Sequence, residues 1–114
     1  MEFINKMEYE IYYINKKNRL ESMLLCSLKA RIDWCEEGLK FVSWEYEYIE
    51  KGSAKTLQDI FKKYSLLRYD KRRKKQYRTI NMGDIILFDN EPWIISSFGF
   101  LRIPEILWRK VKKF

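Results

Sequence analysis

Apolar positions are densest in the stretch DIILFDNEPWIISSF, residues 84–98. Its first six residues are apolar at each inner position, which is typical of a strand covered on both faces of a sheet. A turn is predicted at residues 90–92, because Asn tolerates turn conformations and Pro has no N–H to donate to a neighbouring strand. The last six residues predict the returning strand. We therefore expect an antiparallel hairpin that acts as a scaffold.

Two further stretches have the composition or the alternation of strands. Residues 8–14 are rich in Tyr and Ile, which favours a strand with both faces at least partly covered. Residues 41–49 alternate between apolar and polar, as in a half-buried strand. Their expected apolar face consists of Val42, Trp44, Tyr46 and Tyr48. The Lys-Gly-Ser sequence at 51–53 predicts a turn after this strand.

Helical spacing follows the first of these strands. Leu, Ile and Cys recur every three or four residues, which predicts one helix over residues 19–36. Asn18 and Glu21 have the spacing of a capping box at its start, and Gly38 predicts its end. In this arrangement Cys35 is expected to be a buried core thiol.

Two shorter helices are predicted further along the chain. Thr56, with Asp59 three residues later, gives a second capping signal, and the apolar positions after it predict an amphipathic helix that ends near Tyr64. Pro104 is suited to the first position of a helix. Apolar residues then recur between lysines and an arginine, so residues 104–114 predict a basic amphipathic C-terminal helix.

These elements favour an α+β fold, with an antiparallel sheet of about four strands and two or three helices packed against it. At 114 residues the chain is long enough for one hydrophobic core, so residues 1–114 are expected to form a single domain. A hydrophobic content of 46% indicates a folded protein despite 34% charged residues. No apolar run reaches the roughly 20 residues of a membrane span, and no secretory signal is indicated. We therefore expect a cytoplasmic protein with reduced cysteines.

The net charge of +7 is concentrated in the C-terminal part of the chain. Residues 1–67 contain 11 basic and 11 acidic side chains, whereas residues 68–114 contain 12 basic and 5 acidic ones. Residues 68–78 form a basic linker with seven basic residues and one acid. Its candidate binding residues are Arg68, Lys71, Arg72, Arg73, Lys74, Lys75, Tyr77 and Arg78. The tail contains a second basic cluster of Arg109, Lys110, Lys112 and Lys113.

The basic linker predicts binding to a nucleic acid or to an acidic protein. Lysine and arginine neutralise phosphates and release counterions, and the interleaved Tyr69 and Tyr77 are suited to stack on unpaired bases. The alternative is a solvated loop without a partner, because blocks of like charge repel and tend to stay disordered.

Residues for catalysis or metal binding are scarce. The chain has no histidine, which excludes a Ser–His–Asp triad, a Cys–His pair and the commonest metal ligand. Cys26 and Cys35 are too few, and wrongly spaced, for a zinc cluster. Glu45 and Glu47 share a strand face and form a possible hydrolytic pair, but a solvated polar face is the simpler interpretation. Asp84 is expected to be a turn or capping acid. We expect a protein that is not an enzyme, with no metal and no cofactor.

Several motifs occur in a fixed order along the chain. They are TINMGDIIL at 79–87, WIISSFGF at 93–100 and Pro-Glu at 104–105, preceded by strand-like segments at 9–14 and 44–48 and a helix-like segment at 56–61. This order resembles the YodL-like domain family. The chain departs from the family pattern by a longer helical insert at 18–38, the basic linker and the basic tail. The family is typical of phages, plasmids and conjugative elements and has no established catalytic motif.

The resemblance implies a genomic setting more than a chemistry. We therefore expect a non-catalytic accessory protein of a phage or mobile element. It would bind a host protein or ribonucleoprotein, such as a defence nuclease, through its basic surface and inhibit it, as anti-CRISPR proteins do. The alternatives are a protein that sequesters a nucleotide-like ligand in an aromatic pocket and a general nucleic-acid-binding module. The Tyr-rich first strand also leaves room for a homo-oligomer.

Overall fold

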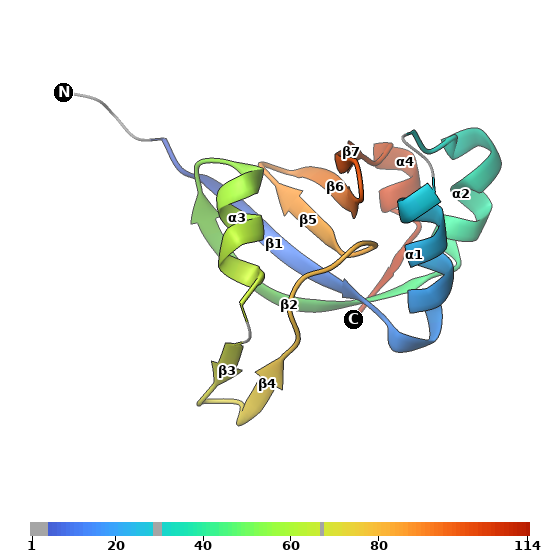
Figure 1. The fold of residues 1–114 in the computed structure, drawn as a ribbon. Helices are drawn as coiled ribbons and strands as arrows, with labels where there is room; N and C mark the ends of the chain where they lie inside the picture. The colour runs from blue at the N-terminus through green and yellow to red at the C-terminus, as the bar shows by residue number, and fades with distance from the viewer. Residues whose placement is uncertain (1–4, 29–30, 67) are drawn as a thin grey trace.

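The sheet is built around β1 (Met7–Ile14), which in the computed structural model pairs antiparallel with β2 (Glu45–Ala54) and with β5 (Ile85–Phe88). The structure describes residues 5–28, 31–66 and 68–114. Within them, six strands form one sheet in the order β7-β6-β5-β1-β2-β8 (Figure 1). The remaining strands of this sheet are β6 (Glu91–Ser96), β7 (Gly99–Arg102) and β8 (Lys112–Lys113).

The fold class expected from the sequence is confirmed, but the strand count was too low. All neighbouring strands of the sheet are antiparallel except β2 and β8, which run parallel. The two strands of this sheet that the sequence analysis missed are β7, which follows the central hairpin, and β8, in the tail. Both are short edge strands, and their apolar pattern alone does not mark them as strands.

The central hairpin of β5 and β6 is confirmed, with a tighter turn than expected. Phe88 pairs with Glu91, so the turn consists of Asp89 and Asn90. Both turn residues have a positive φ, of 51° and 64°. This is the backbone of a type I′ turn, which matches the twist of the flanking strands and which Asn and Asp tolerate. Pro92 therefore lies inside β6 rather than in the turn.

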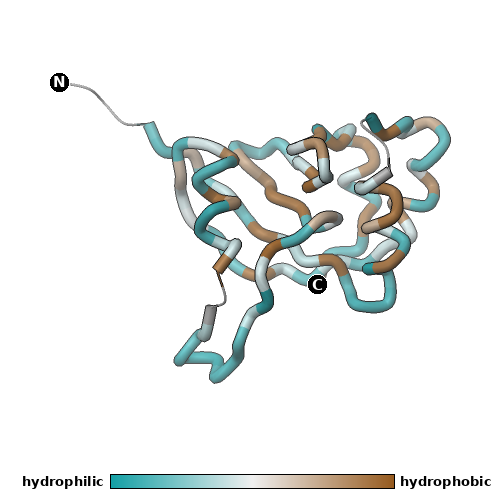
Figure 2. Tube along the Cα trace, viewed as in Figure 1, coloured by the Kyte–Doolittle hydropathy of each residue, from teal (hydrophilic) through white to brown (hydrophobic). Residues whose placement is uncertain are grey.

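Helices cover both faces of the sheet, and the side chains of β1 alternate between two cores. Ile11 and Tyr13 pack on one face with α3 (Leu57–Tyr64). Tyr12 and Ile14 pack on the other face. That second core also includes residues of α1 (Arg19–Leu28), α2 (Trp34–Val42) and α4 (Glu105–Trp108). Figure 2 shows the hydrophobic residues gathered along the middle strands.

The single helix expected over residues 19–36 is two helices. A 3₁₀ turn (Lys16–Asn18) leads into α1, and α2 begins after Asp33, whose carboxylate accepts the N–H of Cys35 at 3.0 Å. Residues 29–30 of the expected helix lie outside the described residues. The helical break exposes Cys35 and leaves Cys26 buried, so the expectation of a buried Cys35 was wrong.

The expected capping box and the expected ends of two elements were also wrong. Asn18 Oδ1 accepts the N–H of Glu45 at 3.0 Å instead of capping α1. Gly38 lies inside α2, where a Cβ would come 3.2 Å from Leu107. Gly52 pairs with Tyr9 inside β2 and does not lie in a turn. A glycine is needed there because the Tyr9 ring packs over it and leaves no room for a Cβ.

The predicted helix at 57–64 is confirmed as α3, with Thr56 Oγ1 accepting the N–H of Asp59 at 3.1 Å. The predicted C-terminal helix at 104–114 was wrong beyond Trp108. After α4 the chain turns and joins the edge of β2, where Phe114 N donates to the carbonyl of Tyr46 at 2.8 Å. Pairing with an open strand edge satisfies the backbone of these residues in place of a helix. No helix among the described residues is long and apolar enough to cross a membrane.

Gly83 and Gly99 offer a matched test of the packing between α1 and the turn that precedes β5, since both have a positive φ, of 91° and 112°. An alanine at either position is strained by that conformation, at a cost of about 1 kcal/mol. At Gly83 the added Cβ would also lie 2.5 Å from Ser22 Oγ, whereas nothing lies within 4 Å at Gly99. We expect Gly83→Ala to lower the free energy of unfolding by about 1–3 kcal/mol more than Gly99→Ala. Urea denaturation measures both, and equal losses would contradict this packing.

Candidate nucleic-acid interface

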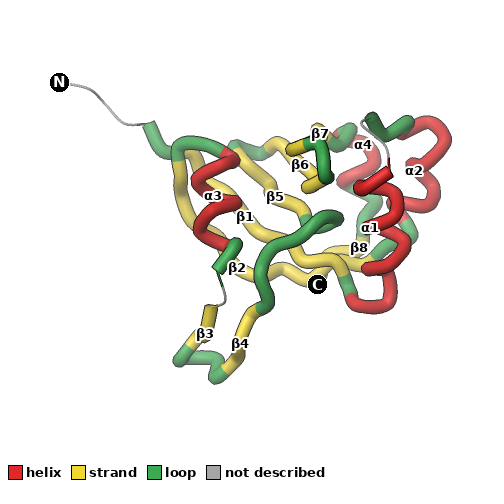
Figure 3. The backbone as a smooth tube through the Cα atoms, viewed as in Figure 1, coloured by secondary structure: helices red, strands yellow, loops and turns green. Residues whose placement is uncertain are grey.

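The basic linker of residues 68–78 folds into a hairpin of its own. Its strands are β3 (Arg68–Asp70) and β4 (Lys75–Tyr77), which pair antiparallel as a separate two-stranded sheet. Figures 1 and 3 show this hairpin projecting away from the six-stranded sheet. Residues 68–77 therefore form a hairpin, and the alternative of a solvated segment without a partner stays open.

A single acid organises the tip of the hairpin. Asp70 Oδ1 accepts the backbone N–H groups of Arg72 at 2.9 Å and of Arg73 at 3.3 Å. Lys74 then takes a positive φ of 50° before β4 begins. Asp side chains commonly close turns in this way, so one carboxylate gives the basic tip a defined backbone.

Arg73 is directed back toward the sheet and holds the hairpin to β2. Its Nη1 donates to the carbonyl of Ile49 at 3.2 Å and to Tyr77 Oη at 2.8 Å. The Tyr77 hydroxyl that accepts this bond raises the pKa of Arg73. Tyr77 itself is 7% exposed and belongs to the core shared with α3. The expected stacking role of Tyr77 is therefore blocked in this structure, because its ring is covered.

Arg78 and Asp84 form a buried ion pair at the base of the hairpin. Arg78 Nη1 lies 2.6 Å from Asp84 Oδ2, and Nη2 lies 2.7 Å from Oδ1. Asp84 is 0% exposed and also accepts the N–H groups of Ile14 at 2.9 Å and of Asn81 at 2.8 Å. Burial raises the pKa of Asp84, while the guanidinium and both N–H groups oppose that rise. Burial lowers the pKa of Arg78, but the hydrogen bond and charge of Asp84, together with Tyr13 and Glu47, outweigh burial and raise that pKa.

The sequence analysis therefore missed the role of this pair. Asp84 was expected to be a turn or capping acid, and its bond to Asn81 N fits that expectation only in part. Arg78 also lies over the Tyr13 ring, with Cζ 4.2 Å from the ring centroid, and its carbonyl accepts the Tyr13 hydroxyl at 3.1 Å. Through these contacts, the main role of Arg78 is to stabilise the fold.

Three cations at the tip remain available to a partner. Lys71, Arg72 and Lys74 are exposed, and their side chains form no hydrogen bond or ion pair with any residue that the structure describes. Tyr69 on β3 is 61% exposed beside them. Arg68 contributes its backbone to β3, and its side chain lies outside the described part of the chain. The tip therefore combines free cations with an exposed aromatic ring.

The second basic cluster lies at the edge of β2 instead of on a helix. Lys112 and Lys113 form β8, next to Glu45 and Tyr46 of β2. Lys113 Nζ donates to the carbonyl of Trp108 at 2.8 Å and lies over its ring, and burial lowers the pKa of this lysine. Two further members are Lys110, which is exposed, and Arg109, which lies 3.7 Å from Glu105.

The two carboxylates that form a possible hydrolytic pair in the sequence have separate partners. Glu45 Oε2 lies 2.8 Å from Lys17 Nζ, and Glu47 Oε1 lies 3.3 Å from Lys75 Nζ. The described residues also contain no group of three or more His, Cys, Asp or Glu side chains that could hold a metal ion. This arrangement favours the interpretation of Glu45 and Glu47 as a charged strand face.

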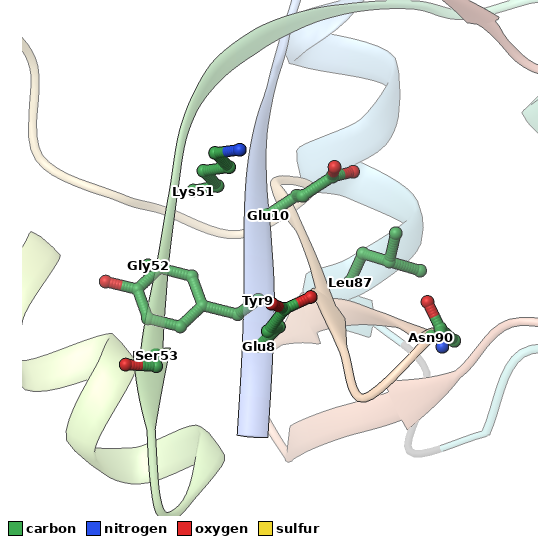
Figure 4. A pocket seen from close by; sticks show the side chains of 8 residues that line it. All are labelled: Glu8, Tyr9, Glu10, Lys51, Gly52, Ser53, Leu87 and Asn90. Carbon is green, nitrogen blue, oxygen red and sulfur yellow. The ribbon is translucent and has the colours of Figure 1, made fainter. Parts of the chain in front are cut away.

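A recess of about 470 Å³ near the start of β1 has the wrong charge for a polyanion. Glu8, Glu10 and Lys51 line it, together with Tyr9, Gly52, Ser53, Leu87 and Asn90. Figure 4 shows the Tyr9 ring lying beside Gly52. The two acids would repel phosphate, so this recess does not extend the basic surface.

Comparisons with known proteins add no family to this description. No protein-family model, curated protein or solved structure matches the chain. The resemblance to the YodL-like domain family therefore stays a prediction.

Arg78 and Lys75 provide a test of the distinction between structural and available cations. Arg78 lies at the base of the hairpin and Lys75 begins β4 next to the tip, and each pairs with one acid. Arg78→Met leaves a buried carboxylate without its partner, so we expect a loss of about 3–5 kcal/mol in the free energy of unfolding. Lys75→Met removes a half-exposed pair and should cost less than about 1 kcal/mol. Urea denaturation compares the two, and similar losses would refute the structural role of Arg78.

Proposed function

We propose that this chain is a non-catalytic binding protein that holds a nucleic-acid strand, such as the RNA of a host ribonucleoprotein, on the tip of its basic hairpin. The observation that carries the proposal is the division of the cations. Arg73, Lys75 and Arg78 pair with acids or with a backbone carbonyl of the domain, whereas Lys71, Arg72 and Lys74 pair with nothing in the described chain. Cations that lie close together and have no acidic partner in the protein are suited to neutralise phosphates.

The exposed Tyr69 supports a single-stranded partner. Its ring is 61% exposed and lies one residue from the turn that carries the cations. Aromatic side chains beside cations bind single strands by stacking on bases, while the cations follow the backbone. An acidic protein surface would use the cations but has no base to place on this ring.

The resemblance to the YodL-like domain family supports the biological part of the proposal. A phage or mobile-element protein that occupies the RNA or the nucleic-acid path of a host defence nuclease would inhibit it by competition. This mechanism needs a stable surface and no chemical step. The hairpin supplies such a surface, because Arg73 from the turn and Arg78 from the base both hold the hairpin to the domain.

A triple substitution tests the proposal. Lys71→Gln, Arg72→Gln and Lys74→Gln together remove the free cations, and we expect binding of a fluorescent single-stranded RNA to weaken strongly. The slope of log affinity against log salt should fall by about 2, since each phosphate contact to a single strand contributes about 0.7. Fluorescence anisotropy over a salt series measures both quantities.

The control variant removes the same charge elsewhere. Lys40, Lys55 and Lys62 are exposed, and no side-chain pairing holds them to the described residues. Their substitution by Gln should leave affinity and salt slope close to those of the unsubstituted protein. Equal effects of the two triple variants would show that only net charge matters, and that result would overturn the hairpin as the interface.

A further inference from the structure

A recess of about 400 Å³ lies at the base of the basic hairpin. Its walls come from three places: the end of β1 with the two residues after it, the middle of β2, and β4 with Arg78. Small-ligand sites in proteins usually measure about 300–1,000 Å³, so this volume suits a ligand of the size of one nucleotide.

The recess has a surplus of positive charge. Among the described residues, its ionisable lining groups other than tyrosines are Lys16, Lys75, Arg78 and Glu47. Lys16 has no side-chain hydrogen bond or ion pair with any of the described residues. The Lys75–Glu47 pair spans 3.3 Å, with the two side chains 50% and 56% exposed. Such exposed pairs contribute little stability, so Lys75 is free to exchange Glu47 for a phosphate.

Arg78 contributes a flat surface to this recess. One face of its guanidinium lies against the Tyr13 ring, and its edge donates to Asp84. The side chain is nevertheless 28% exposed. Arg78 lines the recess together with Tyr13, and planar guanidinium groups stack on nucleobases.

From this arrangement we infer that the recess binds one nucleotide, with its phosphate held by Lys16 and Lys75 and its base stacked on the Arg78 guanidinium. The inference rests on the proposed function, because it names the part of a bound strand that enters the domain below the hairpin tip. The same groups would also accept a free nucleotide. The two sources share one chemistry, a phosphate attached to a nucleoside.

Lys16→Ala and Lys17→Ala form a matched pair of variants. Lys17 is the neighbouring residue, pairs with Glu45 at 2.8 Å and does not line the recess. The probes are AMP, adenosine and a short single-stranded oligoadenylate RNA. We expect Lys16→Ala to weaken AMP and RNA binding by about tenfold, the loss of one charge-assisted hydrogen bond, and to leave adenosine binding unchanged. Lys17→Ala should change each affinity by less than about twofold.

A second variant acts in the opposite direction. Glu47→Gln removes the carboxylate that competes for Lys75, so AMP should bind more tightly and adenosine should not. Calorimetry of AMP and adenosine and anisotropy of the RNA give the three affinities. A gain for AMP in Glu47→Gln supports the phosphate position even if Lys16→Ala is less stable.

The outcomes separate this inference from the proposed function. Weaker AMP binding in Lys16→Ala with unchanged RNA binding supports the recess as a site for a free nucleotide. If AMP does not bind, and Lys16→Ala binds the RNA as tightly as the unsubstituted protein, the recess inference is overturned. In that case a loss of RNA binding in the triple tip variant would still support the proposed function.

Discussion

The buried carboxylate of Asp84 is the interaction on which the arrangement of this protein depends. Its carboxylate oxygens accept hydrogen bonds from the N–H of Ile14 at the end of β1 and from both terminal nitrogens of Arg78. Its backbone carbonyl accepts the N–H of Ile95 in β6. One residue thus joins the central strand, the central hairpin and the chain that leaves the basic hairpin. A buried charge is tolerated only when it is paired and hydrogen-bonded, so these segments are held in one relative position.

This constraint explains why only some of the basic side chains of the hairpin are left exposed and unpaired. Arg78 is fixed by Asp84, and Arg73 is fixed by the carbonyl of Ile49. Both guanidinium groups hold the hairpin to the domain. Arginine suits this role because its guanidinium carries several donors in a rigid plane, which the lysine ammonium lacks. Lys71 and Lys74 are left at the tip, where the turn closed by Asp70 keeps them in solvent. The same run of basic residues therefore serves both structure and binding.

Local patterns predicted much of the scaffold, and tertiary contacts decided the rest. The apolar runs of β5 and β6 and the Thr56 cap of α3 are local signals, and both predictions are confirmed. The position of Tyr77 is different: it depends on strand register. Tyr69 pairs with Gln76, so these two share the exposed face of the hairpin and the ring of Tyr77 turns to the core. The register of a hairpin is set by its turn, which charge composition does not indicate.

The most direct test of this account is the mapping of backbone amide shifts in isotope-labelled protein titrated with single-stranded RNA. The account predicts that the largest shifts occur in the hairpin tip, at Lys71, Arg72 and Lys74, and around Lys16 and Lys75, which line the recess, with little change in α1 and α2. Shifts confined to α1, α2 or the tail, or no shifts at all, would contradict it.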